Sequence, residues 1–180
     1  MRRRYLTEIF SPKADAPQNM TTFDNSPASQ LSLHSVHRNT NDIWLLLGRI
    51  ALGTIFIVSG FGKLTHLGGF EASLAVKGVP LPWLAAFVGA PVEFFGGLAI
   101  VLGIAGRYAA LLMLAFTAVA TLISHRYWEY SEAAVRQVQL SNFLKNIAIM
   151  GGFLSLFAQG AGRFALDRFL QHLNPRGGAR

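Results

Sequence analysis

The chain has 180 residues, of which 52% are hydrophobic and only 14% are charged, and it contains no cysteine. A soluble domain carries roughly 25% charged residues, so the composition excludes an ordinary water-soluble protein, and the lack of thiols excludes disulfides, cysteine nucleophiles and iron–sulfur ligation. The net charge of +7 is compatible with nucleic-acid binding. We expect none, because Arg and Lys gather beside apolar segments, where they set membrane topology and meet lipid headgroups.

Residues 1–40 differ in composition from the rest of the chain. They are rich in Ser, Thr, Asn, Pro and Gln and lack a sustained apolar run, so we predict a disordered, basic N-terminal tail on the cytoplasmic side. The three arginines at positions 2–4 are not followed by the apolar region of a signal peptide, and the acidic residues of the tail argue against a transit peptide. A second short basic tail is predicted at residues 172–180.

Four long apolar segments follow the tail. We predict an all-α, polytopic membrane protein whose membrane domain spans residues 41–171, with transmembrane helices at about 43–62, 81–103, 107–124 and 143–160. Each segment approaches the roughly 20 residues that are needed to cross the hydrocarbon core. The third segment, YAALLMLAFTAVATLIS, lacks the polar stripe that a helix of a soluble bundle would show.

The connections between these segments differ in length. Segments two and three are separated by the short stretch 103–106, which predicts a tight turn and antiparallel neighbours. Residues 64–80 are expected to form a longer loop. Residues 125–142 carry Tyr127, Trp128 and Tyr130, and we expect a short amphipathic helix in the membrane interface.

Positive charge predicts the orientation. With the N-terminus in the cytoplasm, ten basic residues lie on that side: Arg2, Arg3, Arg4, Lys13, Arg38, Arg107, Arg163, Arg168, Arg176 and Arg180. The opposite side holds five: Lys63, Lys77, Arg126, Arg136 and Lys145. The positive-inside rule therefore favours both termini in the cytoplasm.

Glu93 lies near the middle of the second segment, where a carboxylate costs several kcal/mol unless it is paired, protonated or hydrated. Ala85, Gly89, Glu93 and Gly97 recur every four residues on one helix face. Small residues allow a neighbouring backbone to come close, so we expect Glu93 to face the bundle interior. From the depths of the two residues at 1.5 Å per residue, we predict a buried Arg49–Glu93 ion pair, which either fixes helix packing or handles protons.

Four polar residues are expected near the opposite membrane boundary: Lys63, His125, Lys145 and Asn146. They are candidate contacts for a bound ligand, although boundary lysines also snorkel to headgroups and His125 could be an ordinary interfacial histidine. His125 and Glu129 have helical spacing, but we expect no metal site. The chain lacks a phosphate loop, a dinucleotide fingerprint, HExxH and GxSxG.

Several motifs resemble the DoxX family of small bacterial membrane proteins. They are GRIALGTIFIVSGFGKL, the P-x-E-x-x-G-G-L pattern at Pro91–Leu98, the G-x-x-x-R turn at Gly103–Arg107 and the ending FLKNIAIMGGFLSLFAQGAGRFALD. The resemblance covers about residues 43–170. It implies a four-helix inner-membrane protein in which Arg49, Lys63, Glu93, Lys145 and Asn146 are the polar positions that match the pattern.

The resemblance also implies a connection with membrane redox systems, such as a thiosulfate:quinone oxidoreductase subunit and complexes that handle oxidative stress. In a chain without cysteine, electron transfer would use a bound quinone or a cofactor of a redox partner. The first hypothesis is thus a quinone-associated subunit in which Glu93 handles a proton and the four boundary residues bind the quinone. The second is a non-enzymatic scaffold for partner proteins, and the third a small-solute transporter. The absence of an evident internal repeat argues against transport by a monomer, whereas a homo-oligomer could still carry it out.

Overall fold

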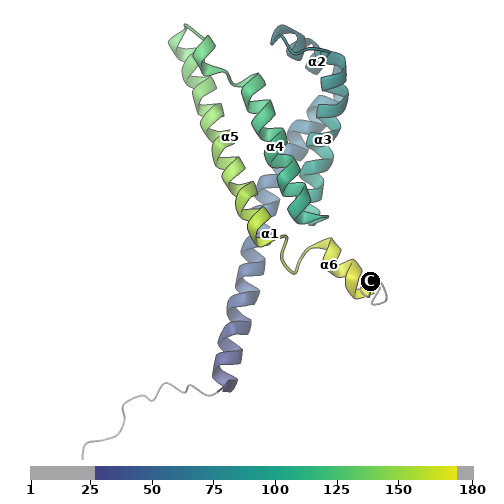
Figure 1. Ribbon diagram of the computed structural model, residues 1–180, viewed down its shortest axis with the longest axis vertical. Helices are drawn as coiled ribbons and strands as arrows, with labels where there is room; N and C mark the ends of the chain where they lie inside the picture. The colour runs from purple at the N-terminus through teal and green to yellow at the C-terminus, as the bar shows by residue number, and fades with distance from the viewer. Residues whose placement is uncertain (1–26, 174–180) are drawn as a thin grey trace, which may run out of the picture. The chain divides into compact units, whose positions relative to one another are not determined.

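The computed structural model describes the backbone of residues 27–173 and the side chains of residues 41–171. Its elements are helical throughout this range (Figure 1): α1 (Pro27–Thr65), α2 (Leu67–Val76), α3 (Pro82–Leu102), α4 (Gly106–Ser124), the 3₁₀ turn η1 (Tyr127–Glu129), α5 (Ala133–Gln159) and α6 (Leu166–Leu173). The predicted all-α class is confirmed.

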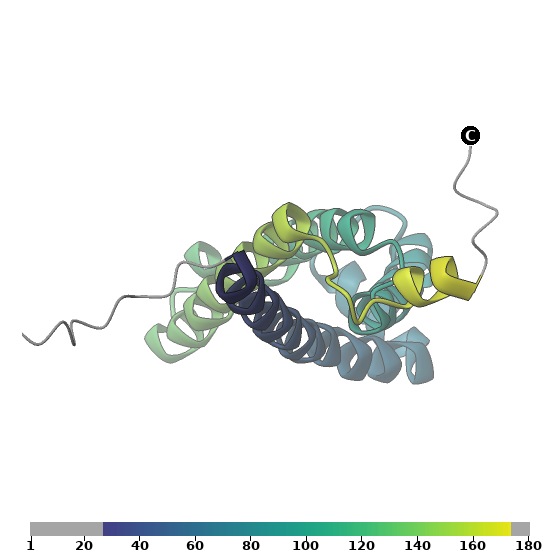
Figure 2. The ribbon, with the colours of Figure 1, turned by 90° about the horizontal axis from the view of Figure 1, so that it is seen from below.

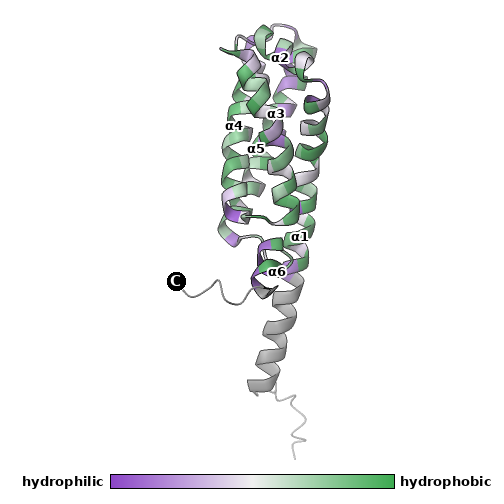
Figure 3. Cartoon of the chain, turned by 90° about the vertical axis from the view of Figure 1, so that its right-hand side faces the viewer, coloured by the Kyte–Doolittle hydropathy of each residue, from purple (hydrophilic) through white to green (hydrophobic). Residues whose placement is uncertain are grey.

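Four helical stretches are long and apolar enough to cross a membrane: Asn41–Thr65, Pro82–Leu102, Gly106–Glu129 and Ala133–Gln159. Figure 3 shows apolar residues along these helices, with many of the polar residues toward their ends. Large apolar side chains point outward, such as Val58, which is 67% exposed, and Phe87. An outward apolar surface is what lipid requires, so the predicted four-span bundle is confirmed.

The first helix begins earlier than predicted. α1 starts at Pro27, whereas the sequence pattern suggested a tail as far as residue 40. Proline suits the first turn of a helix because its missing N–H has no partner there, and neither glycine nor proline interrupts residues 28–47. Residues 1–26 and 174–180, which hold the rest of the two predicted tails, lie outside the described residues.

Two connections also differ from the prediction. The expected loop at 64–80 contains the helix α2, and the expected interfacial helix at 125–142 does not form as a separate element. Instead, η1 is followed by α5, which starts at Ala133, well before the predicted residue 143. Residues 133–150 contain no glycine or proline, so the polar first turns simply continue into the apolar span.

The predicted tight turn between α3 and α4 is present, and it places these helices antiparallel. Gly103 and Ala105 both adopt the left-handed conformation, with φ of 72° and 47°. Glycine does so at little steric cost, whereas Ala105 is held by a hydrogen bond of 2.6 Å from its N–H to Asp167 Oδ2. Asp167 thereby places a negative charge at the N-terminus of α4, where the helix dipole favours it.

Helices α1 and α3 approach each other closely at glycines. A Cβ atom on Gly60 would lie 2.6 Å from the Phe94 nitrogen, and one on Gly97 would lie 2.9 Å from the Gly53 oxygen. The close approach expected at Gly97 is therefore present. At Gly89 a Cβ would meet only ordinary contacts of 3.8 Å or more, so that glycine is not required by packing.

The buried core lies where α1, α3, α4 and α5 meet. Its members are Phe56, Ile100, Ala109, Ala110, Met113, Phe153 and Leu156. The rings of Phe56 and Phe153 have centroids 5.4 Å apart and join α1 to α5. Figure 2 shows the helices from one end, with α6 near the end at which α5 finishes.

Candidate functional site

Glu93 is buried near the middle of α3, with 4% of its surface exposed, as its position beside Gly97 suggested. Its carboxylate forms an ion pair with the ammonium of Lys63, in the last turn of α1. The Lys63 ammonium also lies 5.1 Å from the centroid of the Phe70 ring. The Lys63 side chain is 31% exposed, so the ion pair joins the buried Glu93 carboxylate to a side chain that reaches the surface of the bundle.

The predicted ion pair between Arg49 and Glu93 is wrong, because the two residues have different partners. Arg49 is 1% exposed, and its guanidinium donates to the carbonyl oxygen of Ala161, to that of Val101 at 2.9 Å and to that of Phe164 at 3.1 Å. The last carbonyls of a helix have no partner within it, and an arginine fork can satisfy several. Arg49 therefore bonds one carbonyl at the end of α3 and two in the α5–α6 connection, whereas Glu93 pairs with Lys63.

A cavity of about 210 Å³ lies beside the Lys63–Glu93 pair. Helices α1, α3, α4 and α5 all contribute to its wall, whose polar members are Ser59, Lys63, Glu93, Thr117, Ser124, His125, Lys145 and Asn146. Five apolar side chains complete it: Ile55, Phe56, Phe116, Ala120 and Ile149. The structure therefore brings together five of the six predicted site residues and excludes Arg49.

Asn146 is held by a threonine hydroxyl of α4. Its amide donates to Thr121 Oγ1 at 2.8 Å, and the Thr121 hydroxyl donates to the Thr117 carbonyl at 2.6 Å. Both threonines are 2% exposed. Neither threonine was predicted as a site residue, although their spacing of four residues within an apolar helix indicates one polar face.

His125 and Lys145 are each fixed by an amide side chain of α5. His125 Nδ1 lies 2.9 Å from Gln139 Oε1, and the Lys145 ammonium donates to Asn142 Oδ1 at 2.9 Å. An ammonium carries three N–H groups and an amide two, so Lys145 and Asn146 retain donors beyond these bonds. The wall thus combines an acid–base pair, fixed donors and an apolar surface.

Known proteins resemble this chain over most of its length. The sequence profile of the DoxX family matches residues 44–126, and that of the SURF4 family matches residues 91–172. Inner membrane protein YphA of Escherichia coli (strain K12) is 38% identical over 126 residues, which are 70% of this chain and 89% of YphA. The chain belongs to the DoxX family. Inner membrane protein YqjF of the same organism is 34% identical over 133 residues, which cover 74% and 96% of the two chains.

No solved structure matches the chain. The DoxX match contains Lys63, Glu93 and His125, whereas Lys145 and Asn146 lie within the SURF4 match. The two profiles together therefore cover the whole cavity wall. The relationship to YphA and YqjF and the four apolar helices identify this DoxX protein as a multi-pass protein of the inner membrane.

Proposed function

We propose that this DoxX protein binds the ring of a quinone in the cavity beside Glu93 and serves as the quinone-associated subunit of a membrane redox system. The observation that carries this proposal is the convergence of five polar residues on one cavity within the apolar bundle: Lys63, Glu93, His125, Lys145 and Asn146. Ionisable groups inside a membrane mark functional sites by default, since they are expensive to keep there.

The size and chemistry of the cavity fit such a ring. Pockets for drug-sized ligands measure roughly 300–1,000 Å³, so a cavity of about 210 Å³ suits a single ring rather than an entire lipophilic molecule. Phe56 and Phe116 supply flat apolar walls. The remaining N–H groups of Lys145 and Asn146 are suited to the two carbonyl oxygens of a quinone.

A bound quinone would supply two-electron, two-proton chemistry, with the electrons delivered by a redox partner. In this chain, Glu93 Oε2 and Lys63 Nζ share a hydrogen bond beside the cavity. Glu93 is positioned to hold a proton in the interior, and the partly exposed Lys63 is positioned to exchange it with the membrane boundary. Lys145 and Asn146 orient the ring.

The test is to extract lipophilic molecules from the purified protein and to identify them by mass spectrometry. Stoichiometric quinone is expected in the wild type and in Lys77→Ala, which removes a lysine outside the cavity. Lys145→Ala and Asn146→Leu should lose it. Glu93→Gln should retain quinone and lose its reduction in native membranes. Bulk phospholipid without quinone in the wild type would contradict the proposal.

A non-enzymatic scaffold is the second candidate, and Arg49 favours it. This buried arginine holds α1, the end of α3 and the α5–α6 connection together through carbonyl groups, so intramembrane charge in this protein also serves packing. A scaffold predicts that Lys63→Glu combined with Glu93→Lys restores the assembly lost in either single variant and retains partner capture. A double variant that assembles but has lost redox activity would favour the quinone site.

The membrane orientation that fits the charge distribution places both termini in the cytoplasm. Arg107, Arg163 and Arg168 would then face the cytoplasm, and Lys63 and His125 the periplasm. Reporter fusions after residue 180 test this: a fluorescent protein should fold there, and alkaline phosphatase should be inactive. The reverse result would invert the side from which the cavity exchanges protons.

A further inference from the structure

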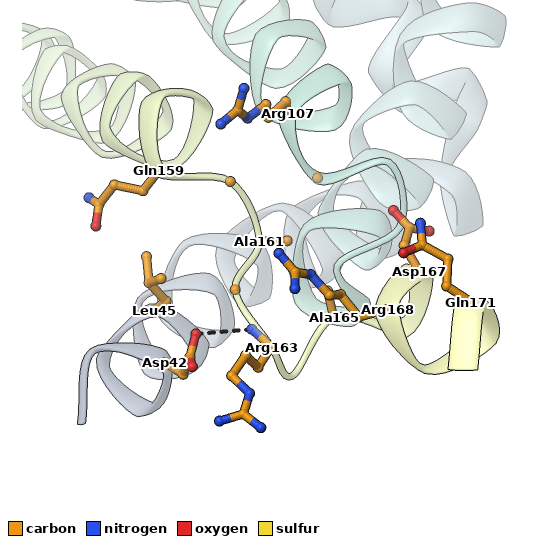
Figure 4. A pocket seen from close by; sticks show the side chains of 13 residues that line it. Asp42, Leu45, Arg107, Gln159, Ala161, Arg163, Ala165, Asp167, Arg168 and Gln171 are labelled. Carbon is orange, nitrogen blue, oxygen red and sulfur yellow. Dashed lines mark hydrogen bonds between the residues drawn. The ribbon is translucent and has the colours of Figure 1, made fainter. Parts of the chain in front are cut away.

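A second pocket lies at the other end of the bundle, where α1 enters its span, α4 begins and the chain passes from α5 to α6 (Figure 4). Its volume is about 780 Å³, and its wall carries Asp42, Arg107, Arg163, Asp167 and Arg168. This pocket shares no residue with the cavity beside Glu93, so a ligand bound here would occupy a site separate from the proposed quinone site.

Asp42 is the buried acid of this pocket. The residue is 7% exposed, and its Oδ1 accepts a hydrogen bond of 3.0 Å from the Arg163 N–H. Its other oxygen, Oδ2, is buried and has no hydrogen-bond partner within the part of the chain that the structure describes. A buried carboxylate oxygen left unpaired is unfavourable, so Asp42 is prepared for a donor that carries positive charge.

Two arginines of the same wall are suited to an anion. Arg107 makes one long hydrogen bond of 3.4 Å to the Ala158 carbonyl. In Figure 4 the guanidinium of Arg168 lies toward the middle of the view, while that of Arg163 points away from it. Asp167 already accepts the Ala105 N–H. The pocket therefore offers a carboxylate oxygen for a cation and guanidinium groups for a phosphate.

An apolar groove adjoins this polar pocket. Its volume is about 490 Å³, and it shares Leu45 and Gln159 with the pocket. From there it follows α1 and α5, where Gly48, Leu52 and Gly152 are among the residues that line it. A polar pocket at the helix ends suits a phospholipid headgroup, and the adjoining apolar groove along the membrane spans suits an acyl chain.

We propose that the pocket and groove bind one aminophospholipid of the phosphatidylethanolamine type. Its primary ammonium bonds Asp42 Oδ2, its phosphate bonds Arg107 and Arg168, and one acyl chain lies in the groove between α1 and α5. Phosphatidylcholine has neither an N–H nor a headgroup O–H to donate to Asp42. The glycerol hydroxyls of phosphatidylglycerol can donate but carry no positive charge, so their bond to the carboxylate is weaker than that of an ammonium. Inorganic phosphate would satisfy the arginines and leave the groove empty.

The test uses the full-length protein, stripped of lipid in detergent. Dioleoyl phosphatidylethanolamine, phosphatidylcholine, phosphatidylglycerol or inorganic phosphate is then added, and retained lipid is measured by native mass spectrometry alongside thermal stability. We expect about one phosphatidylethanolamine per chain, bound about tenfold more tightly than the other two lipids, which is the value of one charge-assisted hydrogen bond. Equal retention of the three lipids, or equal stabilisation by phosphate alone, would overturn the proposal.

Two variants assign the contacts. Asp42→Asn keeps an oxygen for the Arg163 N–H, and it should abolish the preference for phosphatidylethanolamine while leaving phosphatidylglycerol binding unchanged. Arg168→Gln should weaken all three lipids. Glu132→Gln, which removes a carboxylate at the start of α5, is the matched control and should behave as the wild type does. A preference that persists in Asp42→Asn would show that the carboxylate does not select the headgroup.

Discussion

Arg49 and Glu93 are both buried within the apolar spans, and the protein accommodates them differently. Arg49 has carbonyl partners from the end of α3 and the α5–α6 connection, whereas Glu93 has the side chain of Lys63 and a cavity beside it. A charge that is bonded to backbone carbonyls, as Arg49 is through Nη1 and Nη2 although its Nε has no partner among the described residues, joins helices together. A charge that is paired with a partly exposed side chain can change its protonation or its partner, so the comparison separates a packing residue from a candidate reaction centre.

The largest loss of stability is expected for Arg49→Leu. It removes three partly buried hydrogen bonds, to the carbonyls of Ala161, Val101 and Phe164. A hydrogen bond to a charged group contributes roughly 1.5–3 kcal/mol, so the total loss should be about 3 kcal/mol or more. Arg49→Lys keeps the charge and loses the fork geometry, and it should show an intermediate loss. Thermal unfolding in detergent measures both.

The different partners of Arg49 and Glu93 also predict the result of exchanging their charges. Because Arg49 and Glu93 are not partners, combining Arg49→Glu with Glu93→Arg should be at least as damaging as the worse single variant. Recovery of assembly in this double variant would mean that the two residues interact after all.

Removal of Lys63 should have the next largest effect. Lys63→Met leaves Glu93 buried without its partner, which should reduce stability by about 2 kcal/mol, below the full value for breaking a buried pair because Lys63 is partly exposed. Adding Glu93→Gln should recover much of that loss. A double-mutant cycle of unfolding free energies gives the coupling, and additive losses would contradict the pairing.

Two glycines of α1 test whether the close approach of α1 to α3 positions the Lys63–Glu93 ion pair. Gly60→Ala introduces a methyl group against the backbone of Phe94, the residue after Glu93, and overpacking of this kind costs roughly 1–3 kcal/mol. Gly62→Ala is a matched control on the same helix, because a Cβ there meets nothing within 4 Å. It should be neutral or slightly stabilising, since alanine favours helix more than glycine does. Equal melting temperatures for the two variants would refute the close approach of α1 and α3.

The smallest loss of stability is expected for Asn146→Ala, a change in the wall of the cavity beside Glu93. It removes one hydrogen bond to Thr121, worth about 1 kcal/mol. If the cavity binds quinone, the loss of bound quinone should be far larger than this loss of stability. Thr121→Val is the companion variant: it should lower stability similarly while the Asn146 amide remains available to the ligand.

The sequence by itself determined the membrane class and the number of spans. Hydropathy and length suffice for this, because a lipid-facing helix must be apolar over about 20 residues. The same scarcity of charge within the spans singled out Glu93, Lys63, Lys145 and Asn146, and the four-residue spacing around Gly97 predicted that Glu93 would face inward.

Only the tertiary structure decided which charges meet. Depth along a helix does not determine which face a neighbouring helix packs against. The close contact of Gly60 with Phe94 brings the last turns of α1 beside Glu93. Backbone carbonyls at a helix end are present in every sequence and give no residue-specific signal, so the partners of Arg49 could not be read from residue types. The unpaired oxygen of Asp42 likewise became apparent only when α1, α4 and the α5–α6 connection enclosed one pocket.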